Sequence, residues 1–280
     1  MSDRRPRPAG TAGRPRPAGT VPRALVVPAV LGLGLLVLPL VALLVRADWA
    51  TVPAAITSPA ALDALALSLR TGLAAVALCL VLGVPLALVM ARARPRVADL
   101  LRAIVTLPLV LPPMVGGVAL LYLLGRNGLI GRYLDLAFGV RIPFTTTAVV
   151  LAQAFVAMPF LIISVEGALR TAGTRYETVA ATLGAGRALT FRTITLPLVL
   201  PGLIAGTVLC FARALGEFGA TALFAGNAAG VTRTMPLAIY TAFNGAGVTQ
   251  ESAVALSLLL VVVAVVILVL VRGWRPEVPR

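Results

Sequence analysis

Arg213 and Glu217 are the residues of this 280-residue chain that are best placed for chemistry, because they lie four positions apart at the end of a long apolar stretch. Residues at positions i and i+4 share one face of a helix, so the two side chains could pair or line a path for a charged solute. The glycines Gly216 and Gly219 could instead end the helix here. The spacing therefore predicts either a functional pair at membrane depth or a structural ion pair at a helix end.

Other residue types that carry catalysis are scarce. The chain has 24 Arg but no Lys and no His, which excludes a Walker-type phosphate loop and removes the commonest metal ligand and general base. Cys79 and Cys210 lie in apolar stretches with no second ligand nearby, so we interpret them as small buried hydrophobic residues. We expect no catalytic residue, no metal and no cofactor on this chain, and hence no enzyme.

The composition is that of a membrane protein. Hydrophobic residues make up 59% of the chain and charged residues 12%, whereas water-soluble domains have about 45–50% and about 25%. The net charge of +14 does not predict nucleic-acid binding, because the arginines fall between apolar segments. Six charge-free windows are long enough to cross about 30 Å of hydrocarbon, and they predict an all-α protein with six transmembrane helices. The windows are Leu25–Val45, Thr71–Ala91, Ala103–Gly125, Ile142–Val165, Thr193–Ala212 and Ser252–Val271.

The arginines also predict the direction of the chain, since cytoplasmic loops of membrane proteins carry the basic excess. An N-terminus inside places 17 Arg on the cytoplasmic side and six outside, so both termini are expected to be cytoplasmic. Residues 1–23 are rich in Arg and Pro and are predicted to form a disordered cytoplasmic tail. A cleaved signal peptide is the alternative, but 21 apolar residues exceed its usual apolar length of about 7–15.

Prolines interrupt most of the windows, and each one removes a backbone donor from its helix. Ordinary bending of a transmembrane helix explains any single one, such as Pro85 or Pro159. The third window holds a cluster of Pro108, Pro112 and Pro113. This cluster predicts a kinked and movable element, or a segment with an end that does not span the membrane.

The loop Glu166–Arg192 between the fourth and fifth windows has the pattern of a short amphipathic helix. Thr174 to Glu177 has the form of a capping box, which predicts a helix start near Arg175. The apolar residues that follow lie at i, i+3, i+4 and i+7, and Gly184 with Gly186 then offers a stop or a sharp turn. These apolar residues are Tyr176, Val179, Ala180 and Leu183. A stripe of this kind needs either the lipid interface or a groove on a partner protein.

After Gly184 come nine residues and then Ile194-Thr195-Leu196-Pro197. This spacing resembles the EAA loop of permease subunits of type I ABC importers, in which Glu-Ala-Ala precedes the glycine. Thr178, Val179 and Ala180 stand at the Glu-Ala-Ala positions, while Glu177 lies one residue earlier. Which side chain replaces the family's glutamate stays open.

The resemblance implies the type I importer permease (MetI-like) fold and a loop that docks on a separate ATPase subunit. The residues it assigns to this ATPase-coupling loop are Tyr176, Glu177, Val179, Ala180, Leu183, Gly184, Ile194, Leu196 and Pro197. It also implies the partners: a second permease copy, two ATP-binding subunits that hold ATP and Mg, and an extracytoplasmic oxyanion-binding protein.

A second resemblance narrows the cargo. Arg213 to Thr221 with Phe224 to Asn227, and Pro112-Pro113 followed by Gly125 to Gly128, are similar to the molybdate permeases and their sulfate relatives. Phe218 and the segment Thr234 to Tyr240 favour molybdate. The resemblance implies that the translocation path or its gate is formed by Arg213, Glu217, Pro112, Pro113 and Asn227.

This resemblance covers about residues 65–271, which are expected to form the transporter domain in a bacterial plasma membrane. Residues 24–64 would form the first helix and an outer loop, and 272–280 a cytoplasmic tail. Sulfate, thiosulfate or tungstate are alternative cargoes, and two related chains could replace the homodimer. An ion-coupled secondary transporter is the alternative from another class, but the six windows contain no acidic residue.

Overall fold

The computed structural model of the chain describes residues 23–245 and 250–272, and these are helical with no β-strand among them. The predicted all-α fold is confirmed. The chain divides into two compact units, residues 1–46 and 47–280. The first contains a short 3-10 helix, Arg23–Leu25, and α1, Val26–Arg46, which matches the first predicted window. Its 21 residues are almost all aliphatic, as a helix surrounded by lipid tails requires.

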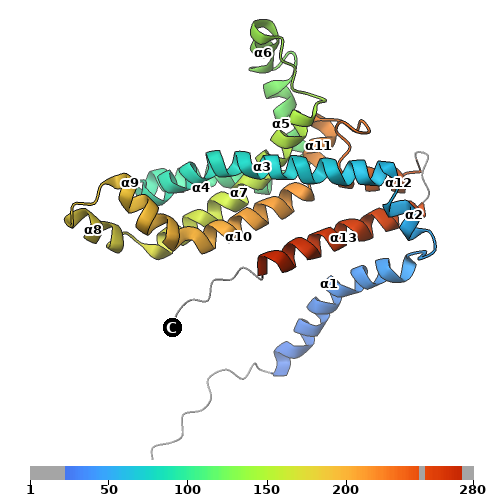
Figure 1. Cartoon of the computed structure of the whole chain (residues 1–280), viewed down its shortest axis with the longest axis horizontal. Helices are drawn as coiled ribbons and strands as arrows, with labels where there is room; N and C mark the ends of the chain where they lie inside the picture. The colour runs from blue at the N-terminus through green and yellow to red at the C-terminus, as the bar shows by residue number, and fades with distance from the viewer. Residues whose placement is uncertain (1–22, 246–249, 273–280) are drawn as a thin grey trace, which may run out of the picture. The chain divides into compact units, whose positions relative to one another are not determined.

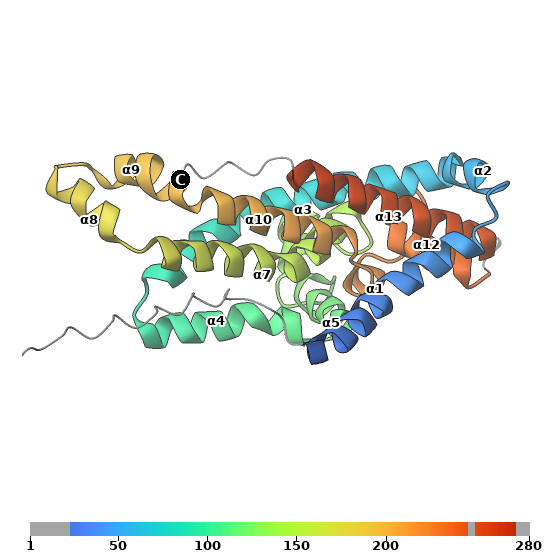
Figure 2. The same cartoon turned by 90° about the horizontal axis from the view of Figure 1, so that it is seen from below.

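Three long helices form the core of the second unit: α3 (Pro59–Arg92), α7 (Thr146–Ala172) and α10 (Leu196–Leu215). Figures 1 and 2 show α7 lying along both α3 and α10. Small residues such as Ala75, Cys79, Ala154 and Ala157 fill the shared interior. Apolar side chains gain little by leaving lipid for protein, so close approach of the helices through small residues is what holds such a bundle together.

The third predicted window is interrupted at its proline cluster, as the prolines predict, and the interruption is a sharp bend. It is broken into α4 (Pro95–Val110) and α5 (Pro113–Leu124), which meet at an angle of 110°. Proline disfavours helical geometry in the residue before it and gives no backbone N–H, so Leu111 and Pro112 leave the helix together. Five helices of the described residues are long and apolar enough to span a membrane, and this broken pair is the sixth candidate.

The other windows correspond to continuous helices with different ends. Ser58 caps α3 by accepting a hydrogen bond from the Ala61 N–H, so this helix begins 12 residues before the predicted Thr71. The fourth span continues beyond the predicted Val165 to the end of α7, and α13 (Gln250–Arg272) is the last span. Pro85 and Pro159 lie inside unbroken helices.

Shorter helices occupy the two ends of the second unit. The segments α8 (Arg175–Thr182) and α9 (Arg187–Thr190) lie at one end, and α2 (Val52–Ile56) and α12 (Met235–Phe243) lie at the other (Figures 1 and 2). Two further short helices, α6 (Gly131–Phe138) and α11 (Gly219–Phe224), follow the broken span and α10. The predicted loop and the Arg213–Glu217 pair therefore lie in different regions of the second unit.

The start of α11 packs closely on α5, and glycine makes this possible. A Cβ atom on Gly117 would lie 2.8 Å from the carbonyl oxygen of Ala220 and 2.9 Å from its Cα. These are backbone atoms, so they cannot move aside as a side chain can. The position of α5 across the bundle depends on this contact.

Replacing Gly117 by Val should separate α5 from α11 and lower the free energy of unfolding by about 1–3 kcal/mol, the usual range for overpacking. The thermal midpoint of the detergent-solubilised protein measures this. Gly167→Val is the matched control, because Gly167 also lies in a helix but faces open space. Equal midpoints for the two variants would show that the α5 contact is not tight.

Candidate functional site

The helix α8 begins at Arg175, as the sequence predicts, but the capping-box contacts are absent. The Thr174 side chain makes no capping hydrogen bond. The Glu177 carboxylate is turned toward the bundle, where its Oε1 accepts hydrogen bonds from Arg92 Nη2 at 2.6 Å and Thr195 Oγ1 at 2.5 Å. A guanidinium is a stronger partner for a carboxylate than a backbone N–H, which explains the difference.

These two partners join α8 to two other elements. Arg92 is the last residue of α3, and Thr195 lies in a five-residue π-helix, Phe191–Thr195, that leads into α10. Sequence reasoning missed both residues, because Arg92 lies 85 positions from Glu177 and no local pattern connects them. Glu177, one residue before the position where the resemblance expects glutamate, thus makes a charged contact with Arg92 of α3.

The apolar stripe of α8 faces away from the bundle. Tyr176 is 59% exposed, Val179 53% and Leu183 82%, whereas Ala180 is buried against the chain. Exposed large apolar residues grouped on one short helix mark an interaction surface. Of the four residues of the predicted stripe, three are exposed, and the fourth, Ala180, faces the chain itself.

A glycine turn closes α8 and fixes its end. Gly184 has a φ of +84°, a conformation that costs a residue with a Cβ. Backbone N–H groups of Gly184 and Ala185 donate to the carbonyl oxygens of Ala181 and Ala180 at 3.0 and 2.9 Å. The loop is therefore a compact and internally bonded projection.

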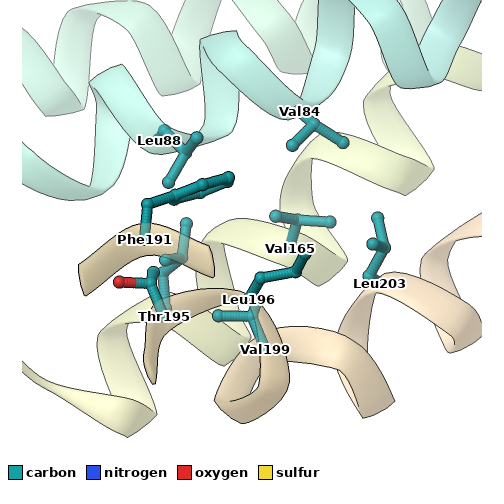
Figure 3. A pocket seen from close by; sticks show the side chains of 9 residues that line it. Val84, Leu88, Val165, Phe191, Thr195, Leu196, Val199 and Leu203 are labelled. Carbon is teal, nitrogen blue, oxygen red and sulfur yellow. The ribbon is translucent and has the colours of Figure 1, made fainter. Parts of the chain in front are cut away.

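The far end of the loop is anchored by Phe191. Its ring points toward Leu88 of α3 in an apolar pocket that Val84 also lines, as Figure 3 shows. The free volume left in this pocket is only about 20 Å³. Of the remaining predicted residues, Leu196 lines the same pocket, Ile194 is half-buried in the π-helix, and Pro197 lies in the first turn of α10.

Arg213 and Glu217 form an ion pair, with 2.7 Å between Arg213 Nη2 and Glu217 Oε2. The helix α10 nevertheless ends at Leu215 with Gly216 as its C-cap, so pairing and the glycine stop both occur. Glu217 is fully buried, and its Oε1 accepts a hydrogen bond from the Ala220 N–H at 2.8 Å. One carboxylate thus joins the end of α10 to the start of α11.

The other residues predicted for the path or gate are divided between two places. Pro112 and Pro113 form the start of α5. A Cβ on Gly219 would lie 3.0 Å from the Cβ of Pro113, which brings this start close to the segment after Glu217. Asn227 is exposed in the next loop, where it donates to Thr241 Oγ1 and accepts from Arg233 Nε. Its contacts hold that loop on α12.

No cluster of three or more His, Cys, Asp or Glu that could hold a metal occurs within residues 23–245 and 250–272. Cys79 and Cys210 are both buried and unoxidised. In each of the two regions a glutamate is paired with an arginine, Glu177 with Arg92 and Glu217 with Arg213, and such pairs fix the positions of helices.

Comparison with known proteins identifies the family. Residues 83–276 match the family described as "Binding-protein-dependent transport system inner membrane component". The chain is 56% identical over 242 residues to the "Molybdenum transport system permease protein ModB" of Mycobacterium bovis, covering 86% of this chain and 90% of that protein. It is 35% identical over 228 residues to the "Sulfate transport system permease protein CysT" of Salmonella typhimurium, covering 80% and 82% of the two chains.

The fold is also found among solved structures. A chain from the crystal structure of a bacterial ABC transporter for import of the acidic polysaccharide alginate superposes with a TM-score of 0.68, covering 92% of this chain and 95% of that one at 17% identity. The predicted importer permease fold and the resemblance to molybdate permeases are confirmed. The chain thus belongs to the family of binding-protein-dependent transport system inner membrane components, the non-catalytic membrane subunits of ABC transporters.

Proposed function

We propose that this chain is the membrane-spanning permease subunit of an ATP-driven molybdate importer, which forms the translocation path. The observation that carries the proposal is the short helix α8, which exposes three apolar side chains from a base fixed by Arg92, Glu177 and Thr195. Such a projection suits a groove on a partner protein better than a flexible loop would, because little of a partner's displacement is lost within it.

The partner of this loop is the ATPase subunit, which binds ATP and Mg. The arginine distribution supports an orientation with both termini, and therefore α8, on the cytoplasmic side. Closure of the ATPase would then move α8, and α7 and α10 would carry this movement into the bundle. The permease chain itself contributes no catalytic group and no cofactor site to this step.

The number of permease copies in the transporter follows from the presence of one coupling loop per chain. An ABC motor closes around two nucleotide sites, so two permease loops are needed for two ATPase subunits. We propose a homodimer of this chain, with an extracytoplasmic oxyanion-binding protein on the opposite side. A pair of different permease chains would instead favour the sulfate type of importer.

Molybdate is favoured over sulfate by the higher identity to the molybdenum permease, 56% against 35%. Both cargoes are tetrahedral dianions, which need a weakly positive path rather than a deep binding well. We place the gate at Arg213, Glu217, Pro112 and Pro113, with Asn227 in the flanking loop. Pairing with Glu217 tempers the charge of Arg213, as weak attraction requires.

Cargo and assembly are measured together. Proteoliposomes with the receptor, this permease and its ATPase should take up labelled molybdate, with competition by tungstate and little competition by sulfate. Native mass spectrometry of the same complex should show two copies of this chain. Uptake of sulfate in preference to molybdate, or two different permease chains, would contradict the proposal.

Leu183→Asp tests the coupling loop. Because Leu183 is 82% exposed, the change should leave folding intact. It places a charge in the proposed ATPase groove, so ATP-driven uptake should fall by about tenfold or more, which corresponds to about 1.4 kcal/mol of lost coupling. Capture of the ATPase subunit by the purified permease should weaken in parallel.

Leu183→Met is the matched control, since it keeps the apolar contact at the same position. We expect normal uptake from this variant. Normal ATPase capture and normal uptake in Leu183→Asp would instead favour the lipid interface as the place of α8.

Arg213→Ala tests the gate. The change leaves the fully buried Glu217 without its cation, and breaking a buried pair costs about 3–5 kcal/mol. Uptake should be lost. Arg213→Met with Glu217→Gln removes both charges at similar volume, so this double variant keeps assembly and isolates the contribution of charge. Unchanged uptake in either assembled variant would count against a role in the path.

A further inference from the structure

We propose that Arg102 and Glu166 are positioning residues that fasten α4 to the stem of the coupling loop, so that the broken span α4–α5 moves with α8. This inference rests on the proposed function. Neither residue is among the predicted coupling, path or gate residues, although Glu166 is the first residue of the predicted loop Glu166–Arg192.

The contact between the two residues is a two-point ion pair. Arg102 Nη2 lies 2.5 Å from Glu166 Oε1, and Arg102 Nε lies 3.4 Å from Oε2. The Glu166 side chain is only 5% exposed, and Arg170 Nη1 is a further cation at 3.6 Å. A buried carboxylate held at both oxygens defines the distance and the orientation of its partner.

The helix α4 has few other attachments to the bundle. Along its 16 residues only Ala98 and Val105 are buried. Leu100, Ile104 and Leu107 are among its exposed apolar residues. Apolar contact alone would let α4 slide along α7, whereas the ion pair holds it at one register.

Glu166 lies in the part of α7 that leads directly to the coupling loop. The helix continues without a break to Ala172, and Gly173, with a φ of +63°, makes the turn into α8. Nine positions separate Glu166 from Arg175, the first residue of α8. A displacement of α8 therefore reaches Glu166 through about two turns of helix.

The other end of α4 leads to the proposed gate. At the 110° bend the chain enters α5, whose Gly117 touches the backbone of Ala220 in α11. The start of α11 is in turn capped by Glu217, the partner of Arg213. The Arg102–Glu166 pair thus joins α7, which leads to the coupling loop, to α4, which leads to the proposed gate. Figure 2 shows α4 and α5 following one another along this route.

The test compares ATP hydrolysis with transport in proteoliposomes of the complete complex. In Arg102→Ala, α4 is released, so uptake of molybdate should fall by about tenfold while ATP hydrolysis stays within about twofold of the parent. The number of ATP molecules hydrolysed per ion imported rises accordingly. A pair with only a structural role would lower both rates together.

Two further variants keep the test decisive if Arg102→Ala does not fold. The reversed pair, Arg102→Glu with Glu166→Arg, should restore coupled uptake. The apolar pair, Arg102→Met with Glu166→Leu, should assemble, because hydrophobic residues often replace a buried ion pair without loss of stability. It should nevertheless remain uncoupled, since it lacks a fixed register.

Asp99→Asn is the matched control. Asp99 also contacts Arg102, at 3.0 Å, but its side chain is 72% exposed, and exposed pairs contribute little. It should leave both rates unchanged. Normal coupling of ATP hydrolysis to uptake in the Arg102→Met with Glu166→Leu variant overturns the inference and leaves the proposed function intact. Failure of the proposed coupling loop is seen separately, as normal uptake in Leu183→Asp.

Discussion

A carboxylate inside a membrane protein must have a cation beside it, and this requirement organises the second unit. Glu166, Glu177 and Glu217 are each paired with an arginine at 2.5 to 2.7 Å. Two of these pairs join helices that are far apart in the chain, and the third holds the turn between α10 and α11. Small residues let the helices approach one another closely, whereas the ion pairs fix the position of one helix along its neighbour.

The pairs divide the structure into a fixed frame and parts attached to it. The frame is α3, α7 and α10, which share one apolar interior. The loop from α8 to the π-helix is attached through Glu177 and Phe191, and the broken span is attached through Arg102. A transporter that must change shape without losing its fold benefits from this arrangement, since a few directed contacts can carry movement between otherwise stable elements.

Particular residues show why some features could be predicted from the sequence and others could not. The start of α8 at Arg175 and the turn at Gly184 follow from local chain chemistry and are present as predicted. The capping role of Glu177 was wrong, because Arg92, distant in sequence, offers its carboxylate a stronger partner than the helix start does. The prolines at 112 and 113 predicted a disturbance in the third window, but the size of the bend depends on how α5 packs on α11.

The sequence by itself determined which segments are apolar helices, where proline and glycine interrupt them, and which family the loop motif belongs to, because these depend on residue type and short spacing. Only the tertiary structure decided which arginine meets which carboxylate, that the stripe of α8 faces outward, and that α4 and α5 turn apart. Each of these depends on side chains brought together across many positions of the chain, where one-dimensional periodicity carries no information.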